Sequence, residues 1–144
     1  MGNQNENLSR RNSMAHFFKE IKSELGPVSS RKVIIMIRKV FRDIQNGLSG
    51  AEKKMMMARL PKYLALLFYG DSSDQGDLPY DHLDQWVANL SREDQSSHEQ
   101  VFYSEISVLR TLVCVLTKLD KQCGLLNFPG FKHSLVRELK EASI

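Results

Sequence analysis

The stretch VLRTLVCVLTKL, residues 108–119, decides which class of fold the chain can adopt. A helix built from it is apolar nearly all round, with Arg110, Thr111, Thr117 and Lys118 as its interruptions. Such a helix belongs at the centre of a bundle, because every side needs cover. The run is also too short and too charged to span a bilayer, which takes roughly 20 apolar residues. We therefore expect other helices to surround it.

Upstream of this stretch, apolar residues recur at the three- and four-residue steps that are typical of helices. A first helix should end at Gly26-Pro27, and a second should run from an N-cap at Ser29 or Ser30 to about Gln45. The apolar positions of the second helix form one broad stripe: Val33, Ile34, Ile37, Val40, Phe41 and Ile44.

A third helix is predicted to start at Ser49, because Glu52 stands three residues later in a capping-box pattern. Pro61 either ends this helix or serves as the first residue of the next one. The methionine triplet 55–57 spans about 200° of a helix surface at 100° per residue, so its members cannot all face one core. We expect one or two of them in the core and one exposed.

The C-terminal half carries further helical patterns. A short amphipathic helix follows Pro79, residues 91–98 form a polar connection, a long helix runs from about Glu99 to Leu119, and a last helix follows Pro129. No convincing alternating strand is present. The predicted fold is all-α, a compact bundle of six or seven helices, with residues 1–13 as a disordered polar arm and residues 14–144 as a single helical domain.

Two segments of the chain resemble one another. IMIRKVFRDI, from Ile35, aligns with SVLRTLVCVL, from Ser107, around the shared Arg38 and Arg110. Each segment is followed some twenty residues later by an apolar residue and a proline, at 60–61 and at 128–129. A degenerate duplication of one unit explains this pattern, and so does a chance likeness between two helices.

The stretches FFKEIKSELG, VIIMIRKVFRDI and LSGAEKKMMMARLPKYLALLFYGD resemble a bacterial helical family of unknown function, the domain of unknown function numbered twenty-two sixty-seven. In that family an Ala-x-Leu-Pro step follows a helix rich in Arg and Leu, and the unit occurs twice. Ala58, Leu60 and Pro61 match the step, and Phe128-Pro129 would be its degenerate second copy. The resemblance covers roughly residues 17–140. It implies an all-helical fold and no established chemistry.

Charge divides the chain into two halves. Residues 1–70 hold 13 Lys and Arg against 5 Asp and Glu, whereas residues 71–144 hold 7 against 12. The two net charges, +8 and −5, add up to the overall +3. A basic half suggests a negatively charged partner, but the acidic half can also pack against, or dimerise with, the basic half.

The basic residues concentrate on the solvent side of the second helix and on the segment that follows it. At 100° per residue, Arg31, Arg38 and Arg42 fall within about 40° of one another, opposite the apolar stripe. We predict a partner-docking basic face, with Ile35 and Met56 as its apolar contacts. Its cationic members are Arg31, Arg38, Lys39, Arg42, Lys53, Lys54, Arg59 and Lys62. A merely solvated helix face is the alternative interpretation.

The sequence contains no motif that is typical of a catalytic or metal-binding site. The acidic loop from Asp71 fails the EF-hand pattern, because its twelfth position is His82 instead of a bidentate Glu. His82 stands between Asp81 and Asp84, where a surface histidine beside a helix start is a simpler explanation than an acid–base pair. Cys114 is expected to be a buried, reduced thiol, as is Cys123. We therefore predict no metal site, no cofactor and no enzymatic activity.

The remaining function classes are binding functions. We expect a non-catalytic helical interaction or adaptor protein that binds a protein partner or a second copy of itself. The alternative is binding of nucleic acid, or of an anionic membrane in the manner of a matrix protein, through the basic N-terminal half. Gly2 favours acylation and membrane attachment, whereas Glu6 opposes them. Because the N-terminus has no apolar stretch, we expect a cytoplasmic protein without a transmembrane segment.

Overall fold

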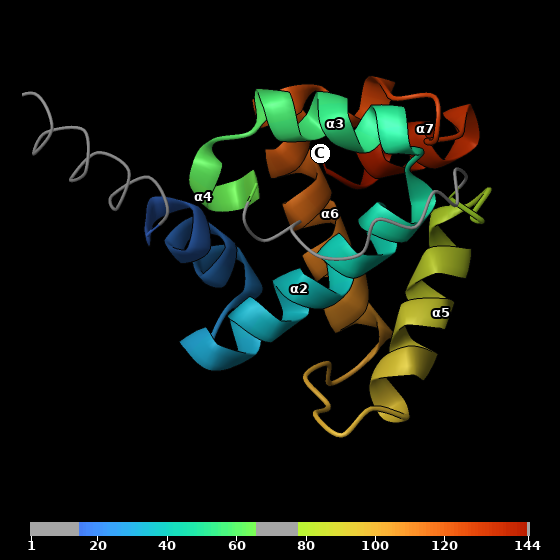
Figure 1. Ribbon diagram of the computed structural model, residues 1–144. Coiled ribbons are helices and arrows are strands. Elements are labelled where there is room, and N and C mark those ends of the chain that lie inside the picture. The colour runs from blue at the N-terminus through green and yellow to red at the C-terminus, as the bar shows by residue number, and fades with distance from the viewer. Residues whose placement is uncertain (1–14, 66–77, 144) are drawn as a thin grey trace, which may run out of the picture.

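The computed structural model describes residues 15–65 and 78–143, which form an all-α bundle, as predicted (Figure 1). The predicted arm at 1–13, with Gly2, and the acidic loop at 71–77 lie outside the described residues. A helix covers residues 15–25. It is followed by α2 (Ser30–Gly47), α3 (Gly50–Arg59), α4 (Lys62–Ala65), α5 (Leu83–Gln95), α6 (Glu105–Cys123), the 3₁₀ turn η2 (Leu125–Asn127) and α7 (His133–Ala142).

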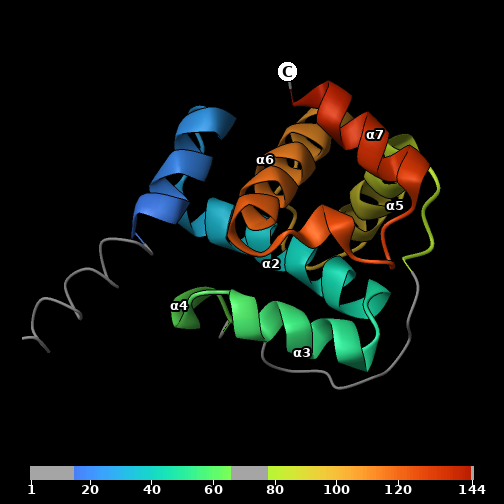
Figure 2. The ribbon, with the colours of Figure 1, turned by 90° about the horizontal axis from the view of Figure 1, so that it is seen from above.

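Helix α6 lies at the centre, where the sequence places residues 108–119. It packs against α2, α3, α5, η2 and α7. Its fully buried residues include Val108, Leu112, Val115, Leu116 and Leu119. Figures 1 and 2 show that α2 crosses α6, with the helix over 15–25 on one side of this pair and α5 on the other.

Local signals set several helix ends as predicted. Ser29 caps α2, and its side chain accepts the N–H of Lys32 at 3.3 Å. The capping box at the start of α3 is present, with the Ser49 N–H bonded to Glu52 at 3.1 Å. Pro61 lies between α3 and α4, so the helix ends before it and a new one begins after it.

Three predicted boundaries are wrong. One is the end of α6, which lies at Cys123 and not at Leu119. The other two border the connection between α5 and α6. Helix α6 begins at Glu105, not at about Glu99, and α5 extends through the predicted connection to Gln95. The cause is a buried carboxylate: Asp94 accepts the N–H groups of Val101 and Phe102 at 3.0 and 3.1 Å. These bonds hold residues 101 and 102 beside the end of α5, and Ser104 then caps the helix that begins at Glu105.

The bundle contains two equivalent helix pairs, the helix over 15–25 with α2, and α5 with α6. Both N-caps are serines 75 positions apart, Ser29 and Ser104, and each accepts an N–H three residues on at 3.3 Å. Burial repeats with the same spacing: Val33 with Val108, Met36 with Thr111, Ile37 with Leu112, Val40 with Val115, Phe41 with Leu116, and Ile44 with Leu119. In the preceding helices, buried Phe17 and Ile21 correspond to Trp86 and Leu90, 69 positions later.

This burial pattern and the alignment drawn from sequence use different registers. Pairing Ile35 with Ser107 uses a spacing of 72, which is three residues short of the spacing that matches burial. In the burial register Arg38 corresponds to Val113 and not to Arg110. A three-residue shift is close to one helical turn and leaves the apolar pattern nearly unchanged, so two amphipathic helices match in either register.

Candidate functional site

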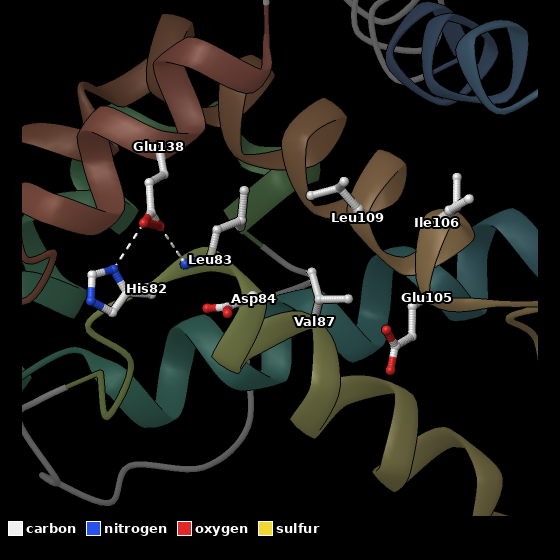
Figure 3. Close-up of a pocket in the computed structure, with 8 residues that line it drawn as sticks. All are labelled: His82, Leu83, Asp84, Val87, Glu105, Ile106, Leu109 and Glu138. Atoms are coloured by element: carbon white, nitrogen blue, oxygen red, sulfur yellow. Dashed lines mark hydrogen bonds and ion pairs between the residues drawn. The ribbon is translucent and has the colours of Figure 1, made fainter.

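A groove of about 570 Å³ opens between the start of α5, the start of α6 and one face of α7 (Figure 3). We call it the acidic groove. Its lining residues are His82, Leu83, Asp84, Val87, Glu105, Ile106, Leu109 and Glu138. The volume falls within the range of about 300–1,000 Å³ that is common for binding pockets.

The floor of the acidic groove is apolar. Leu83 and Val87 of α5 are each 7% exposed, and Leu109 of α6 is partly buried against the core. Ile106 stands one turn before Leu109 on α6 and is 63% exposed. Ile106 and this floor together form an apolar patch that reaches the surface of the molecule.

Carboxylates surround this floor. Glu138 of α7 reaches across to the start of α5, where one oxygen lies 2.8 Å from His82 Nδ1 and the other accepts the Leu83 N–H at 2.7 Å (Figure 3). The bond from this backbone N–H, with a smaller effect of His82, holds the pKa of Glu138 below its usual value. Asp84 and Glu105 are exposed and have no ion-pair partner among the described residues. Two free carboxylates therefore remain at the rim.

A second, smaller groove of about 270 Å³ lies between the helix over 15–25 and the start of α2. We call it the basic groove. Its lining residues are Ala15, Phe18, Lys19, Lys22, Ser30, Val33 and Ile34. Lys22 Nζ donates to Ser30 Oγ at 3.1 Å across the gap between the two helices. Apolar side chains and lysines thus share this surface.

The two grooves occupy equivalent places in the two helix pairs. The spacing of 69 in the first helices relates Phe18 to Val87, and the spacing of 75 in the second helices relates Ile34 to Leu109. Glu105 of the acidic groove corresponds to Ser30 of the basic groove. Each groove is lined in part by the start of the second helix of its pair, but the side chains give the two grooves opposite charge.

Three cations of the predicted basic face are engaged within the chain. Arg31 bonds Glu99 at 2.8 Å, and Arg42 lies 3.4 Å from Glu93. Lys39 is only 12% exposed and donates to three oxygens: Asp94 Oδ1, Ser97 Oγ and the Glu99 carbonyl. The basic half therefore packs against the acidic half within the molecule along α2. This is one of the alternatives raised by the charge division.

The other predicted cations are dispersed. Arg38, Lys54 and Lys62 are exposed, and Lys53 is partly exposed. Arg59 donates to the Cys123 carbonyl at 3.1 Å, and its guanidinium lies over the Phe128 ring. Arg59 thus lies against the C-terminal end of α6. The paired cations of α2 instead contact the end of α5 and its connection to α6.

The predicted apolar contacts of the basic face need correction. Met56 is 0% exposed and forms part of the core, so it cannot touch a partner. Ile35 is partly buried and packs against the core. Within the triplet Met55 is the exposed member, at 43%, which agrees with the expectation of one exposed methionine. The methionine of α3 that faces solvent is therefore Met55 and not the predicted Met56.

Reactive groups do not gather in the described part of the chain. No set of three His, Cys, Asp or Glu side chains in residues 15–65 and 78–143 could hold a metal ion. Cys114 and Cys123 are free and buried, as predicted. Burial, aided by the nearby Glu24, raises the pKa of the Cys114 thiol to about 12, so the thiol stays protonated. Among the described helices, none is long and apolar enough to cross a membrane.

Comparisons of the chain with protein-family models, curated proteins and solved structures found no match. The resemblance to the helical family of unknown function therefore stays a prediction. Sequence reasoning missed the acidic groove, although His82 was placed correctly beside a helix start. The available signal was Ile106, an apolar residue that follows Glu105 at the start of the long helix and is exposed in the structure.

Proposed function

We propose that the protein is a non-catalytic interaction module, and that its acidic groove binds an amphipathic segment of a partner protein. The segment would carry apolar side chains flanked by Lys or Arg. The proposal keeps the binding function expected from the sequence, but it moves the docking site from the basic face of α2 to the groove between α5, α6 and α7.

The observation that carries this proposal is Ile106, exposed at 63% above an apolar floor and beside two free carboxylates. An amphipathic helix can place side chains at i, i+3 or i+4, and i+7 into such a groove. Its cations would meet Asp84 and Glu105 at the rim. Rim charges of this kind raise the association rate and select the partner, while the buried apolar side chains supply most of the affinity.

Nucleic-acid or anionic-membrane binding through the basic half is less well supported. Phosphate binding depends on the number of cations that can release counterions. Arg31, Lys39 and Arg42 already bind acidic side chains of the same molecule. The competing carboxylates would have to be displaced first, which reduces the gain from each phosphate contact.

A peptide-binding measurement tests the proposal. The probe is a labelled synthetic peptide of about 14 residues, four helical turns, with Leu on one face and Lys elsewhere, followed by fluorescence anisotropy. Replacing Ile106→Lys should weaken binding at least about tenfold, because the apolar contact is worth about 1.4 kcal/mol or more. Met55→Lys is the matched control, since it also replaces an exposed apolar side chain but lies on α3. Equal binding by wild type and Ile106→Lys would contradict the proposal.

A further inference from the structure

We propose a second docking site of opposite preference: the basic groove binds an amphipathic segment that carries Asp or Glu beside apolar side chains. This goes beyond the function proposed for the acidic groove and stands on different residues. The outer helices that line the two grooves, the helix over 15–25 and α5, lie on opposite sides of the α2–α6 pair (Figures 1 and 2). Both could therefore be filled at once.

The first argument is geometric. Each groove is lined by residues of the outer helix of a pair and by the start of its long inner helix, α2 or α6. Phe18 and Ile34 stand where Val87 and Leu109 stand in the acidic groove, so the apolar floor is retained. Both linings therefore offer apolar side chains that a peptide side chain can contact.

The second argument is the sorting of charge on the helix over 15–25. Its acids Glu20 and Glu24 turn toward α6, where they lie 2.8 and 3.4 Å from Lys118 Nζ. Its lysines Lys19 and Lys22 line the groove instead. The lining of the basic groove contains no Asp or Glu among the described residues. An approaching carboxylate would thus meet cations without a competing acid from this helix.

The lining also decides between classes of partner. Phe18, Val33 and Ile34 offer an apolar floor that a peptide side chain can enter, whereas a phosphate backbone needs a longer row of cations. Phe18 is the single aromatic residue in this lining, so a platform for successive bases is absent. The combination fits an acidic amphipathic peptide better than a nucleic acid or a lipid surface.

The test uses the full chain labelled with ¹⁵N and a peptide of about 14 residues, four helical turns, with Leu on one face and Glu elsewhere. Amide shifts should concentrate in residues 15–22 and 30–34. The double variant Lys19→Glu with Lys22→Glu should weaken binding at least tenfold. Lys121→Glu with Lys140→Glu makes the same charge change on α6 and α7, outside both grooves, and should leave binding unchanged. Both pairs of residues are exposed, or border solvent, so the variants should fold; circular dichroism checks this.

Three outcomes would overturn the inference. The first is the absence of saturable shifts in the basic groove, and the second is unchanged binding by Lys19→Glu with Lys22→Glu. The third is tighter binding of a uridine oligonucleotide or of phosphatidylserine vesicles to the same residues. The Leu/Lys peptide separates the two proposals. If it binds and the Leu/Glu peptide does not, only the second site is wrong. If the reverse holds, the proposed function of the acidic groove is wrong and the second site stands.

Discussion

Lys39 of α2 and Asp94 of α5 form an ion pair at 2.5 Å, between residues 55 positions apart in the sequence. Asp94 is 2% exposed and also accepts the N–H groups of Val101 and Phe102. The basic half of the chain is thus joined to the acidic half inside the molecule. Some of the opposite charges of the two halves therefore pair with one another and stabilise the fold. The charged side chains that remain exposed to solvent are basic in one groove and mainly acidic in the other.

Removing Asp94 should destabilise the protein strongly. Asp94→Ala leaves the largely buried Lys39 ammonium without its carboxylate and two N–H groups without an acceptor, which should cost about 3–5 kcal/mol. Urea unfolding measures the loss. The control is Glu93→Ala, which breaks an exposed pair with Arg42 and should cost no more than about 1 kcal/mol. Similar losses for both variants would contradict this account of the buried pair.

Glu52 joins the start of α3 to the turn before α7 by accepting two backbone N–H groups. One carboxylate oxygen accepts the Ser49 N–H at 3.1 Å, and the other accepts the buried Gly130 N–H at 2.9 Å. Glu52→Ala leaves both donors unsatisfied, and we expect a loss of about 2–4 kcal/mol. Glu52→Gln keeps one acceptor oxygen and should fall between the alanine variant and wild type. Thermal unfolding can rank the three proteins; an alanine variant as stable as wild type would refute the link.

Gly47 has no room for a side chain. A Cβ at this position would lie 2.4 Å from Leu78 Cδ1 and 3.0 Å from Leu78 Cα. Gly47→Ala should therefore destabilise by about 1–3 kcal/mol through overpacking. Leu78→Ala alone opens a cavity, but part of its cost should vanish in the double variant, because the new methyl group enters the freed space. Strict additivity in this double-mutant cycle would show that the two residues do not compete for space.

Asp43 should make stability depend on pH. It is 8% exposed, and burial raises its pKa from 3.8 to about 6, against the opposing effect of the bond that Trp86 Nε1 donates at 2.9 Å. The folded pKa lies above the unfolded one, so this stabilising contribution is full below about pH 4 and is lost as pH rises through 6. Across that window wild type should lose up to about 3 kcal/mol relative to Asp43→Asn.

The measurement is urea unfolding followed by the fluorescence of Trp86, the only tryptophan in the sequence, at pH 4 and pH 7.5. Asparagine still offers an oxygen to the indole N–H, and it does not titrate. Other ionisable groups are common to both proteins and cancel in the comparison. A stability difference that stays constant between the two pH values would mean that Asp43 does not titrate in this range.

The helices were predictable from the sequence because their signals are local. The caps at Ser29 and Ser49 and the central position of α6 follow from residues within a few turns. The start of α6 depends on two signals. Ser104, its N-cap, is a local signal that the sequence prediction missed. The other signal is not local: Asp94 accepts the N–H groups of Val101 and Phe102 and holds these residues beside the end of α5.

The grooves were not predictable for a related reason. Each is formed by two helices whose separation depends on the packing of the whole bundle, so spacing within one helix does not reveal it. Spacing within α2 alone predicts that Lys39 and Arg42 face solvent, but both contact α5. Whether a charged helix face meets solvent, a partner or a neighbouring helix is known only once the neighbouring helices are placed.

The most direct test of the central claim is a residue-resolved titration of the ¹⁵N-labelled chain with the Leu/Lys peptide. We expect saturable amide shifts confined to residues 82–87 of the α5 start, 105–109 of the α6 start, and the turn of α7 around Glu138. They should disappear in Ile106→Lys and persist in Met55→Lys. Absence of saturable shifts, or shifts that follow α2 and α3 while the groove residues stay unperturbed, would contradict the claim that the acidic groove is the docking site.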